Sequence, residues 1–161
     1  MKLVFLFSFL GFSQEKSVFD IARKGTLEEM KILMKDQPEI INSVDEYSFS
    51  PLILACYRGN IEVALFLMDN VKDVNYKSEQ GTALAALSIN YNKELVLKIL
   101  SKKADPNLAD EQGNTPLIWA VKSGKPELTE ILLKSGADKT LKDQQGISAF
   151  EHALNTKNET I

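Results

Sequence analysis

Residues 110–140 read DEQGNTPLIWAVKSGKPELTEILLKSGADKT, and their plan recurs along the 161-residue chain. Pro116 aligns with Ala149, 33 residues later, and with Ala83, 33 residues earlier; a further 32 residues back stands Pro51. Self-similarity at a period of about 20 to 50 residues is the signature of a repeat protein. Each unit is too small to bury its own apolar faces, so neighbouring units must stack and share a core. We therefore expect a solenoid and not a compact globule.

Each unit is expected to form two short helices. The first begins where Ser or Thr precedes Pro or Ala, because the hydroxyl can cap the helix and Pro at the first helical position loses no hydrogen bond. The four such pairs are Ser50-Pro51, Thr82-Ala83, Thr115-Pro116 and Ser148-Ala149. The second helix contains most of the unit's apolar residues, and they recur at helical spacing, as in Leu95, Val96 and Ile99. The predicted units lie near residues 16–44, 45–76, 77–109, 110–142 and 143–161, the last one incomplete.

The segments GNTPLIWAVKSG (113–124) and LLKSGAD (132–138) resemble the ankyrin repeat pattern, and the resemblance covers residues 18–154. It implies an all-α fold: an ankyrin-repeat solenoid of stacked helix-turn-helix units with short finger loops, about five units including caps. It also implies a non-enzymatic protein-protein interaction module that binds a protein partner on its concave face. An inhibitor or an accessory of an exported enzyme would be such a module.

The chain departs from the ankyrin pattern in two ways. The motif histidine is absent, and its place is taken by Ile53, Ala85, Ile118 and Glu151. In the third unit Gly81 directly precedes Thr82, so that this unit is one residue short. We expect the finger of the third unit to be irregular.

In such a solenoid the fingers and the exposed side of each first helix line one concave groove. The residues expected to contact a partner are Glu46, Tyr47, Phe49, Tyr57, Arg58, Ser78, Glu79, Asn90, Glu111, Gln112, Asn114, Lys122, Ser123, Gln144 and Gln145, with Ile89 in the same row. The aromatic residues are the most informative, because a turn does not need rings to fold and rings beside an arginine are favoured in binding hot spots. The alternative, that Phe49 and Tyr57 pack against an adjacent unit, stays open. Trp119 is expected to face inward between helices.

The composition excludes most catalytic apparatus. The chain has one cysteine, Cys56, one histidine, His152, and a net charge of −3 with no basic block. These features exclude an internal disulfide, a multi-histidine metal site and nucleic acid as the natural partner. We expect Cys56 to be a buried structural thiol and His152 to lie on the surface of the terminal unit. No cofactor is expected.

Two alternatives to a binding module remain open. One is a carboxylate-only, metal-dependent hydrolase with Glu46, Glu79 and Glu111 around a divalent ion, although acids one repeat apart are widely spaced for a single ion. The other is a purely structural repeat array that adds to a longer assembly. For the binding module itself we expect a monomer with an unidentified protein partner.

The first residues follow the pattern of a secretory signal peptide. Lys2 precedes the apolar run LVFLFSFLGF (3–12), and polar residues follow. We expect the signal to span residues 1–13, with the repeat domain over 14–161 and a periplasmic or secreted location. A membrane anchor is disfavoured because ten residues rise only about 15 Å as a helix, half of a hydrocarbon core of about 30 Å. We therefore expect no stable membrane insertion after cleavage. The remaining alternative is an N-terminal strand or core helix of a cytosolic protein.

Overall fold

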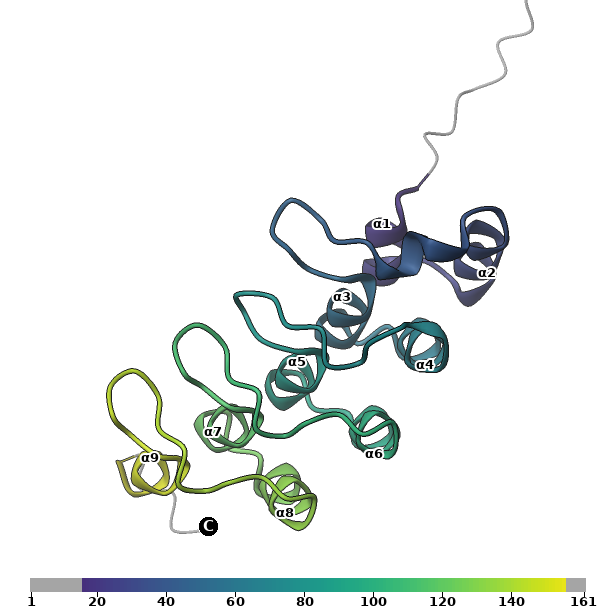
Figure 1. The fold of residues 1–161 in the computed structure, drawn as a ribbon. Coiled ribbons are helices and arrows are strands. Elements are labelled where there is room, and N and C mark those ends of the chain that lie inside the picture. The colour runs from purple at the N-terminus through teal and green to yellow at the C-terminus, as the bar shows by residue number, and fades with distance from the viewer. Residues whose placement is uncertain (1–15, 156–161) are drawn as a thin grey trace, which may run out of the picture.

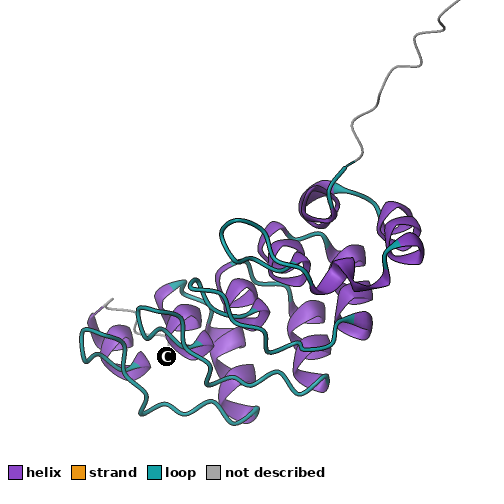
Figure 2. Ribbon diagram, turned by 45° about the horizontal axis from the view of Figure 1, so that its top comes forward, coloured by secondary structure: helices purple, strands orange, loops and turns teal. Residues whose placement is uncertain are grey.

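A computed structural model of the chain describes residues 16–155. This part consists of nine α-helices and one short 3₁₀ helix joined by loops, and it contains no β-strand (Figures 1 and 2). The helices are α1 (Val18–Lys24), α2 (Leu27–Asp36), η1 (Pro38–Asn42), α3 (Pro51–Arg58), α4 (Ile61–Asn70), α5 (Ala83–Ile89), α6 (Lys93–Ser101), α7 (Pro116–Lys122), α8 (Pro126–Lys134) and α9 (Ala149–Asn155). The signal peptide predicted for residues 1–13 lies outside the described residues.

The helices stand in two rows (Figure 1). In the first row α1, α3, α5, α7 and α9 each contact the next, and in the second row α2 contacts α4, which contacts α6. Each helix of the first row except α9 also packs against the helix that follows it in the chain. Successive helix pairs are therefore each other's main tertiary contacts. The predicted all-α solenoid of stacked helix-turn-helix units is confirmed.

The first-row helices begin at the predicted capping residues. The hydroxyl oxygens of Ser50, Thr82 and Thr115 each accept a hydrogen bond from the backbone N–H three residues later, at 3.2 to 3.3 Å. In α2, Thr26 and Glu29 cap each other's backbone N–H groups reciprocally. These caps fix where each helix starts, and hence which side chains it turns toward the next unit.

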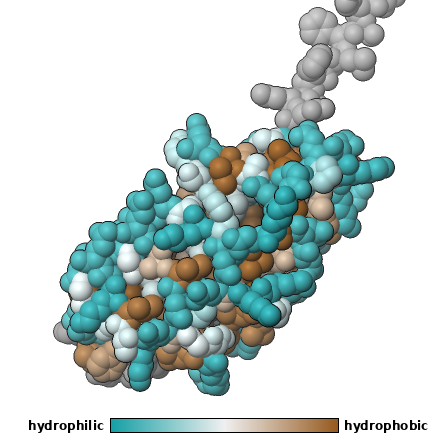
Figure 3. Space-filling model, viewed as in Figure 1, coloured by the Kyte–Doolittle hydropathy of each residue, from teal (hydrophilic) through white to brown (hydrophobic). Residues whose placement is uncertain are grey.

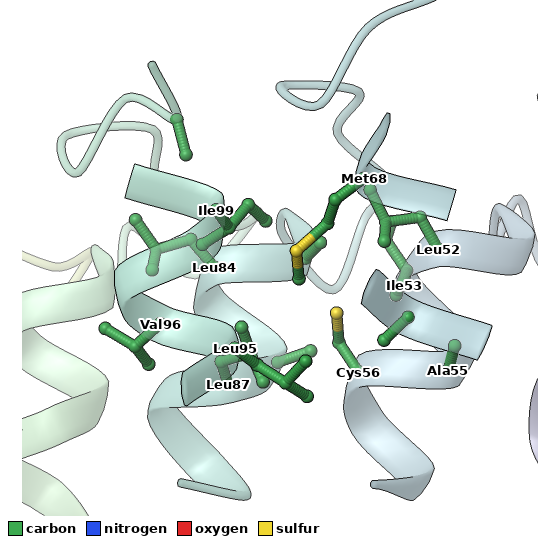
Figure 4. Close-up of a cluster of buried hydrophobic side chains, with 14 of the residues drawn as sticks. Leu52, Ile53, Ala55, Cys56, Met68, Leu84, Leu87, Leu95, Val96 and Ile99 are labelled. Atoms are coloured by element: carbon green, nitrogen blue, oxygen red, sulfur yellow. The ribbon is translucent and has the colours of Figure 1, made fainter. Parts of the chain in front are cut away.

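The core runs between the two rows as one continuous cluster. Figure 4 shows its central part, where Cys56 of α3 lies among side chains of α4, α5 and α6. Cys56, Leu87, Leu95 and Ile99 have no exposed surface. Burial raises the pKa of the Cys56 thiol far above its usual value. The prediction that this cysteine is a buried structural residue is confirmed.

Between the helix pairs the chain forms four fingers, which we define as residues 45–49 (finger 2), 78–81 (finger 3), 110–114 (finger 4) and 143–147 (finger 5). Fingers 2, 4 and 5 close with a 3.0 Å hydrogen bond from the N–H of their first residue to the carbonyl four residues later. In finger 3 the N–H of Ser78 bonds to the carbonyl of Gly81, only three residues later, at 3.1 Å. Finger 3 is thus one residue shorter than the others, which confirms the predicted irregularity.

Backbone hydrogen bonds join some neighbouring fingers but not others. The N–H of Glu111 donates to the carbonyl of Glu79 at 3.0 Å, and the N–H of Gln144 donates to the carbonyl of Gln112 at 2.8 Å. These bonds join fingers 3, 4 and 5 into one edge. Within residues 16–155 no backbone hydrogen bond joins finger 2 to finger 3. The row of backbone hydrogen bonds between fingers is thus interrupted between fingers 2 and 3, where the hydroxyl of Tyr76 donates to the carbonyl of Ser48 at 3.0 Å.

At the end of the units away from the fingers, asparagine side chains form hydrogen bonds between successive units. Asn75 donates to the carbonyl of Lys103 and accepts from the N–H of Asp105. Asn107 repeats the arrangement one unit later, with the carbonyl of Gly136 and the N–H of Asp138. Each asparagine thereby bonds to two backbone groups of the next unit, which holds the units in a fixed orientation.

Candidate partner-binding groove

A groove of about 510 Å³ lies between fingers 2 and 3 and the first-row helices. The first-row helices contribute most of its lining, including Leu54 of α3, Ala86 of α5 and Trp119 of α7. Each of these residues stands four positions after the capping hydroxyl of its helix. The groove thus extends over the second, third and fourth units, with Arg23 of the first unit also in its lining, at the place where the backbone hydrogen bonds between fingers are interrupted.

Exposed apolar side chains surround this groove. Tyr47 is 65% exposed, Tyr57 49% and Ile89 38%, and all three line it. Phe49 also lines the groove, but it is half-buried and packs against the core. The guanidinium of Arg58 lies 5.8 Å from the ring centre of Tyr57, within the range of a cation–π contact. The alternative of packing against a neighbour thus applies to Phe49 and not to Tyr57.

Of the residues predicted to contact a partner, four meet in the groove: Tyr47, Phe49, Tyr57 and Arg58. Others gather in a second, smaller hollow between fingers 4 and 5, lined in part by Gln112, Asn114, Lys122, Gln144 and Gln145. Exposed acids occupy the second position of fingers 2, 3 and 4, namely Glu46, Glu79 and Glu111. Asn90 is exposed and donates to the carbonyl of Tyr57, and Ser123 is half-buried just after α7. The predicted set is therefore divided between two hollows and the finger tips.

Ser78 is wrong as a surface contact, whereas Asn114 is largely buried but still lines the second hollow. Ser78 is only 3% exposed, because its hydroxyl donates to the carbonyl of Gly81 and accepts from the N–H of Gln80 inside the finger. Asn114 is 4% exposed, because its side chain bonds to the carboxylate of Asp110 and accepts from Lys122. Both side chains stabilise a finger from within.

The groove is one local patch on a polar molecule. Figure 3 shows that the visible face is mainly hydrophilic, with separate hydrophobic patches. No helix within residues 16–155 is long and apolar enough to span a lipid bilayer.

Comparison with known families explains the repeated plan. A family model described as "Ankyrin repeats (3 copies)" matches residues 70–143, and one described as "Ankyrin repeat" matches residues 47–79. The chain belongs to the ankyrin repeat family. The ankyrin repeat is a non-catalytic fold that serves protein-protein interaction.

The similar proteins are much longer than this chain. "Ankyrin repeat, SAM and basic leucine zipper domain-containing protein 1" of Dasypus novemcinctus is 31% identical over 61% of this chain and 22% of its own length. "Transient receptor potential cation channel subfamily A member 1" of Homo sapiens is 30% identical over 72% of this chain and 11% of its own. "Inactive serine/threonine-protein kinase TEX14" of Mus musculus is 27% identical over 80% of this chain and 9% of its own. The chain spans about a fifth or less of these relatives.

Although these ankyrin units lack the motif histidine, each finger that begins with aspartate has another donor for its carboxylate. Asp45 accepts from Arg23 of the preceding unit at 2.8 Å. Asp110 accepts from the indole N–H of Trp119 at 2.8 Å, and Asp143 bonds to Nε2 of His152 at 2.6 Å. A buried carboxylate requires such a partner.

This pairing corrects two predictions. Trp119 does not face inward between helices: it is half-buried, donates to Asp110 and lines the groove, with the ammonium of Lys122 5.5 Å from its ring centre. His152 does not lie on the surface of the terminal unit: it is 9% exposed and bonded to Asp143. Both residues stand one position after the place of the motif histidine, where a side chain points to its own finger.

Sequence reasoning missed Leu54, Ala86 and Trp119 as groove residues. A signal for them exists, because they occupy the same position in three successive units. A search for repeat positions at which residue size varies strongly would have found them.

The structure gives no geometric support to the hydrolase alternative. Within residues 16–155 no group of three His, Cys, Asp or Glu side chains is close enough to hold a metal ion. Glu46, Glu79 and Glu111 stand on three different fingers instead of converging on one point.

Asp143 makes the stability of the last finger dependent on pH. Burial acts to raise its pKa, but hydrogen bonds from His152 and from the N–H groups of Ile147 and Gln145 outweigh burial, so that the pKa is lowered. A carboxylate whose pKa is lowered by folding stabilises the protein above its unfolded value of 3.8, and this contribution is lost as the pH falls through the folded value.

We predict that Asp143→Asn lowers the free energy of unfolding at pH 7 by about 1 to 3 kcal/mol, because it removes a charged hydrogen-bond acceptor. The difference from the wild type should persist at pH 5 and shrink as the pH falls below 3.8. Denaturant unfolding at pH 7, 5, 3.5 and 2.5 measures it. A difference that stays constant down to pH 2.5 would contradict the assigned role of the carboxylate.

Proposed function

We propose that this chain binds a segment of a protein partner in the groove around Tyr47 and Tyr57. The observation that carries the proposal is the exposure of Tyr47, Tyr57 and Ile89 around one hollow. Large rings that are exposed in the free protein gain most from being covered, and Tyr and Arg are enriched in binding hot spots. Arg58, exposed beside Tyr57, completes such a combination.

The rigidity of the surrounding scaffold supports the same conclusion. The hydroxyl of Tyr76 donates to the carbonyl of Ser48 in finger 2 at 3.0 Å, and the backbone bonds among fingers 3, 4 and 5 hold the other finger wall of the groove. The asparagine bridges at the end of the units away from the fingers fix the orientation of successive units. A surface that is ordered before binding loses little conformational entropy when a partner arrives. The ankyrin scaffold therefore presents the groove ready for contact.

The double variant Tyr47→Ala, Tyr57→Ala tests the proposal. We expect it to weaken partner binding by at least about 2 kcal/mol, the usual threshold of a hot spot, which is roughly thirty-fold in Kd. Its melting temperature should stay close to that of the wild type because both side chains are largely exposed. A large loss of stability would assign the rings to the core instead.

Site-specific photo-crosslinking identifies the partner and the face together. A photoreactive residue is placed at Tyr57, and in a matched control at Leu97 of α6, which is equally exposed at 49% but does not line the groove. We expect one protein to be linked through position 57 and not through position 97, and the link to disappear when Tyr47 is changed to alanine. Equal linking at both positions would contradict the proposal.

We also propose that the chain acts after export, as a monomer, on a partner in the same compartment, as an inhibitor or an accessory of an exported enzyme. The apolar run at residues 3–12 after Lys2 supports export. Mass spectrometry of the protein recovered from expressing cells tests it: we expect a chain that begins at Gln14. Recovery of the uncleaved chain in the cytoplasm would refute export, and sedimentation at rising concentration tests the monomer.

A further inference from the structure

The groove crosses the third unit, in which two features are reduced in size. At the helix position that lines the groove, α3 carries Leu54 and α7 carries Trp119, but α5 carries only Ala86. The finger of the same unit is one residue shorter than its neighbours. Both changes remove volume at one place, and the hollow lies there.

The walls of this hollow are apolar on several sides. Trp119 of the next unit, Ile89 of the same helix and Tyr57 of the preceding unit all line it together with Ala86. A volume of about 510 Å³ is ample for one large side chain and the backbone that carries it. An apolar side chain that enters such a space loses its contact with water over most of its surface and packs against the protein instead.

The charges around the hollow differ from one edge to the other. On the helix edge, Arg58 forms no ion pair with any residue of the described part of the chain, whereas Arg23 is held by Asp45 at 2.8 Å. On the finger side, Glu46 and Glu79 are exposed next in sequence to the lining residues Tyr47 and Gln80. A carboxylate of a bound segment is therefore attracted to Arg58 and repelled from the finger tips.

We propose that the hollow over Ala86 receives one large apolar side chain, aromatic or leucine-like, from a partner segment that also presents a carboxylate to Arg58. This inference rests on the proposed function of the groove and specifies the chemistry of its occupant. The absence of a large residue at position 86 is then a determinant of specificity: the space that Trp119 fills in the fourth unit is left for the partner in the third.

Small probes of this chemistry test the inference without the natural partner. The full chain, labelled with ¹⁵N, is titrated with 3-phenylpropionate, which combines a phenyl ring with a carboxylate, and separately with phenethylamine, which combines the ring with an ammonium group. We expect saturable shifts of the amide signals of Tyr57, Ala86 and Ile89 with 3-phenylpropionate. Phenethylamine should bind about two- to five-fold more weakly, the range of an exposed ion pair.

Two variants separate the two parts of the proposal. Ala86→Leu places in α5 the residue that α3 already carries at Leu54, and it should abolish the shifts produced by both probes while circular dichroism shows an unchanged fold. Arg58→Gln, at an exposed position, should remove the preference for the carboxylate but leave the binding of the ring. If Ala86→Leu does not fold, Arg58→Gln and the comparison of the two probes still decide the question.

The inference is overturned if neither probe shifts these three amides, if the ammonium probe binds as well as the carboxylate probe, or if a folded Ala86→Leu protein binds as the wild type does. Its failure can be distinguished from failure of the proposed function. Specific crosslinking through position 57 with no binding of the probes would leave the groove as a partner site and remove only the anchor chemistry. Binding of the probes with no crosslinking through position 57 would support the anchor chemistry of the hollow and remove the groove as a partner site.

Discussion

Truncation of Leu95 to alanine is expected to lower the free energy of unfolding by about 2 to 5 kcal/mol. Leu95 lies in α6 with no exposed surface, inside the cluster that joins α3, α4, α5 and α6 (Figure 4). Removal of its side chain leaves a cavity in the shared interior of two neighbouring units, and a stack of thin units cannot close it by local rearrangement alone. Equilibrium unfolding in urea measures the loss.

Leu97 provides the matched control for this substitution. It belongs to the same helix, two positions later, and is 49% exposed. Leu97→Ala makes the same chemical change and should cost less than about 1 kcal/mol, in the manner of an ordinary surface substitution. Equal losses for the two variants would mean that the interior of the stack is not where the structure places it.

The second large effect is expected for Gly113→Ala. Gly113 has a φ of +79°, and a Cβ added there would lie 2.9 Å from the backbone of Asp143 and of Gln144 in the next finger. Positive φ alone costs an L-residue about 1 to 2 kcal/mol. Contact with a neighbouring backbone adds to this cost, because finger 5 must move and its hydrogen bond from Gln144 to Gln112 must stretch. We expect a total loss of at least about 2 kcal/mol in urea unfolding.

Comparison with Gly146→Ala isolates the cost of the contact between the added Cβ at position 113 and the backbone of finger 5. Gly146 occupies the same place in finger 5, with a φ of +75°, but nothing lies within 4 Å of its added Cβ. This variant should show only the cost of positive φ. The difference between the two variants therefore measures how strongly finger 4 resists separation from finger 5. A difference of zero would show that the fingers do not support each other.

The fold could be predicted because its determinants repeat. The spacing of Pro51, Ala83, Pro116 and Ala149 gave the period, and the preceding hydroxyl residues gave the helix starts that the structure shows at Ser50, Thr82 and Thr115. One missing residue before Thr82 was enough to predict an irregular finger. Local rules acted independently at each unit, so that an error in one unit did not affect the next.

The site could be predicted only in part, because exposure depends on partners that sequence position does not show. Tyr47 and Tyr57 were recognised since a ring near a turn has no local role. Ser78 was misplaced, and the burial of Asn114 was missed, because polar residues in tight fingers bond inward to the backbone and to Asp110. Trp119 was misplaced because its indole N–H satisfies a buried carboxylate, a three-dimensional requirement.

The central claim is that a partner covers the surface between finger 2 and α5. Amide hydrogen exchange of the chain, alone and saturated with the protein captured through position 57, tests it most directly. The account predicts slower exchange in residues 46–58 and 78–89 when the partner is bound, with little change in α6 and α8. Slower exchange confined to α4, α6 and α8, or to residues 149–155, would contradict it.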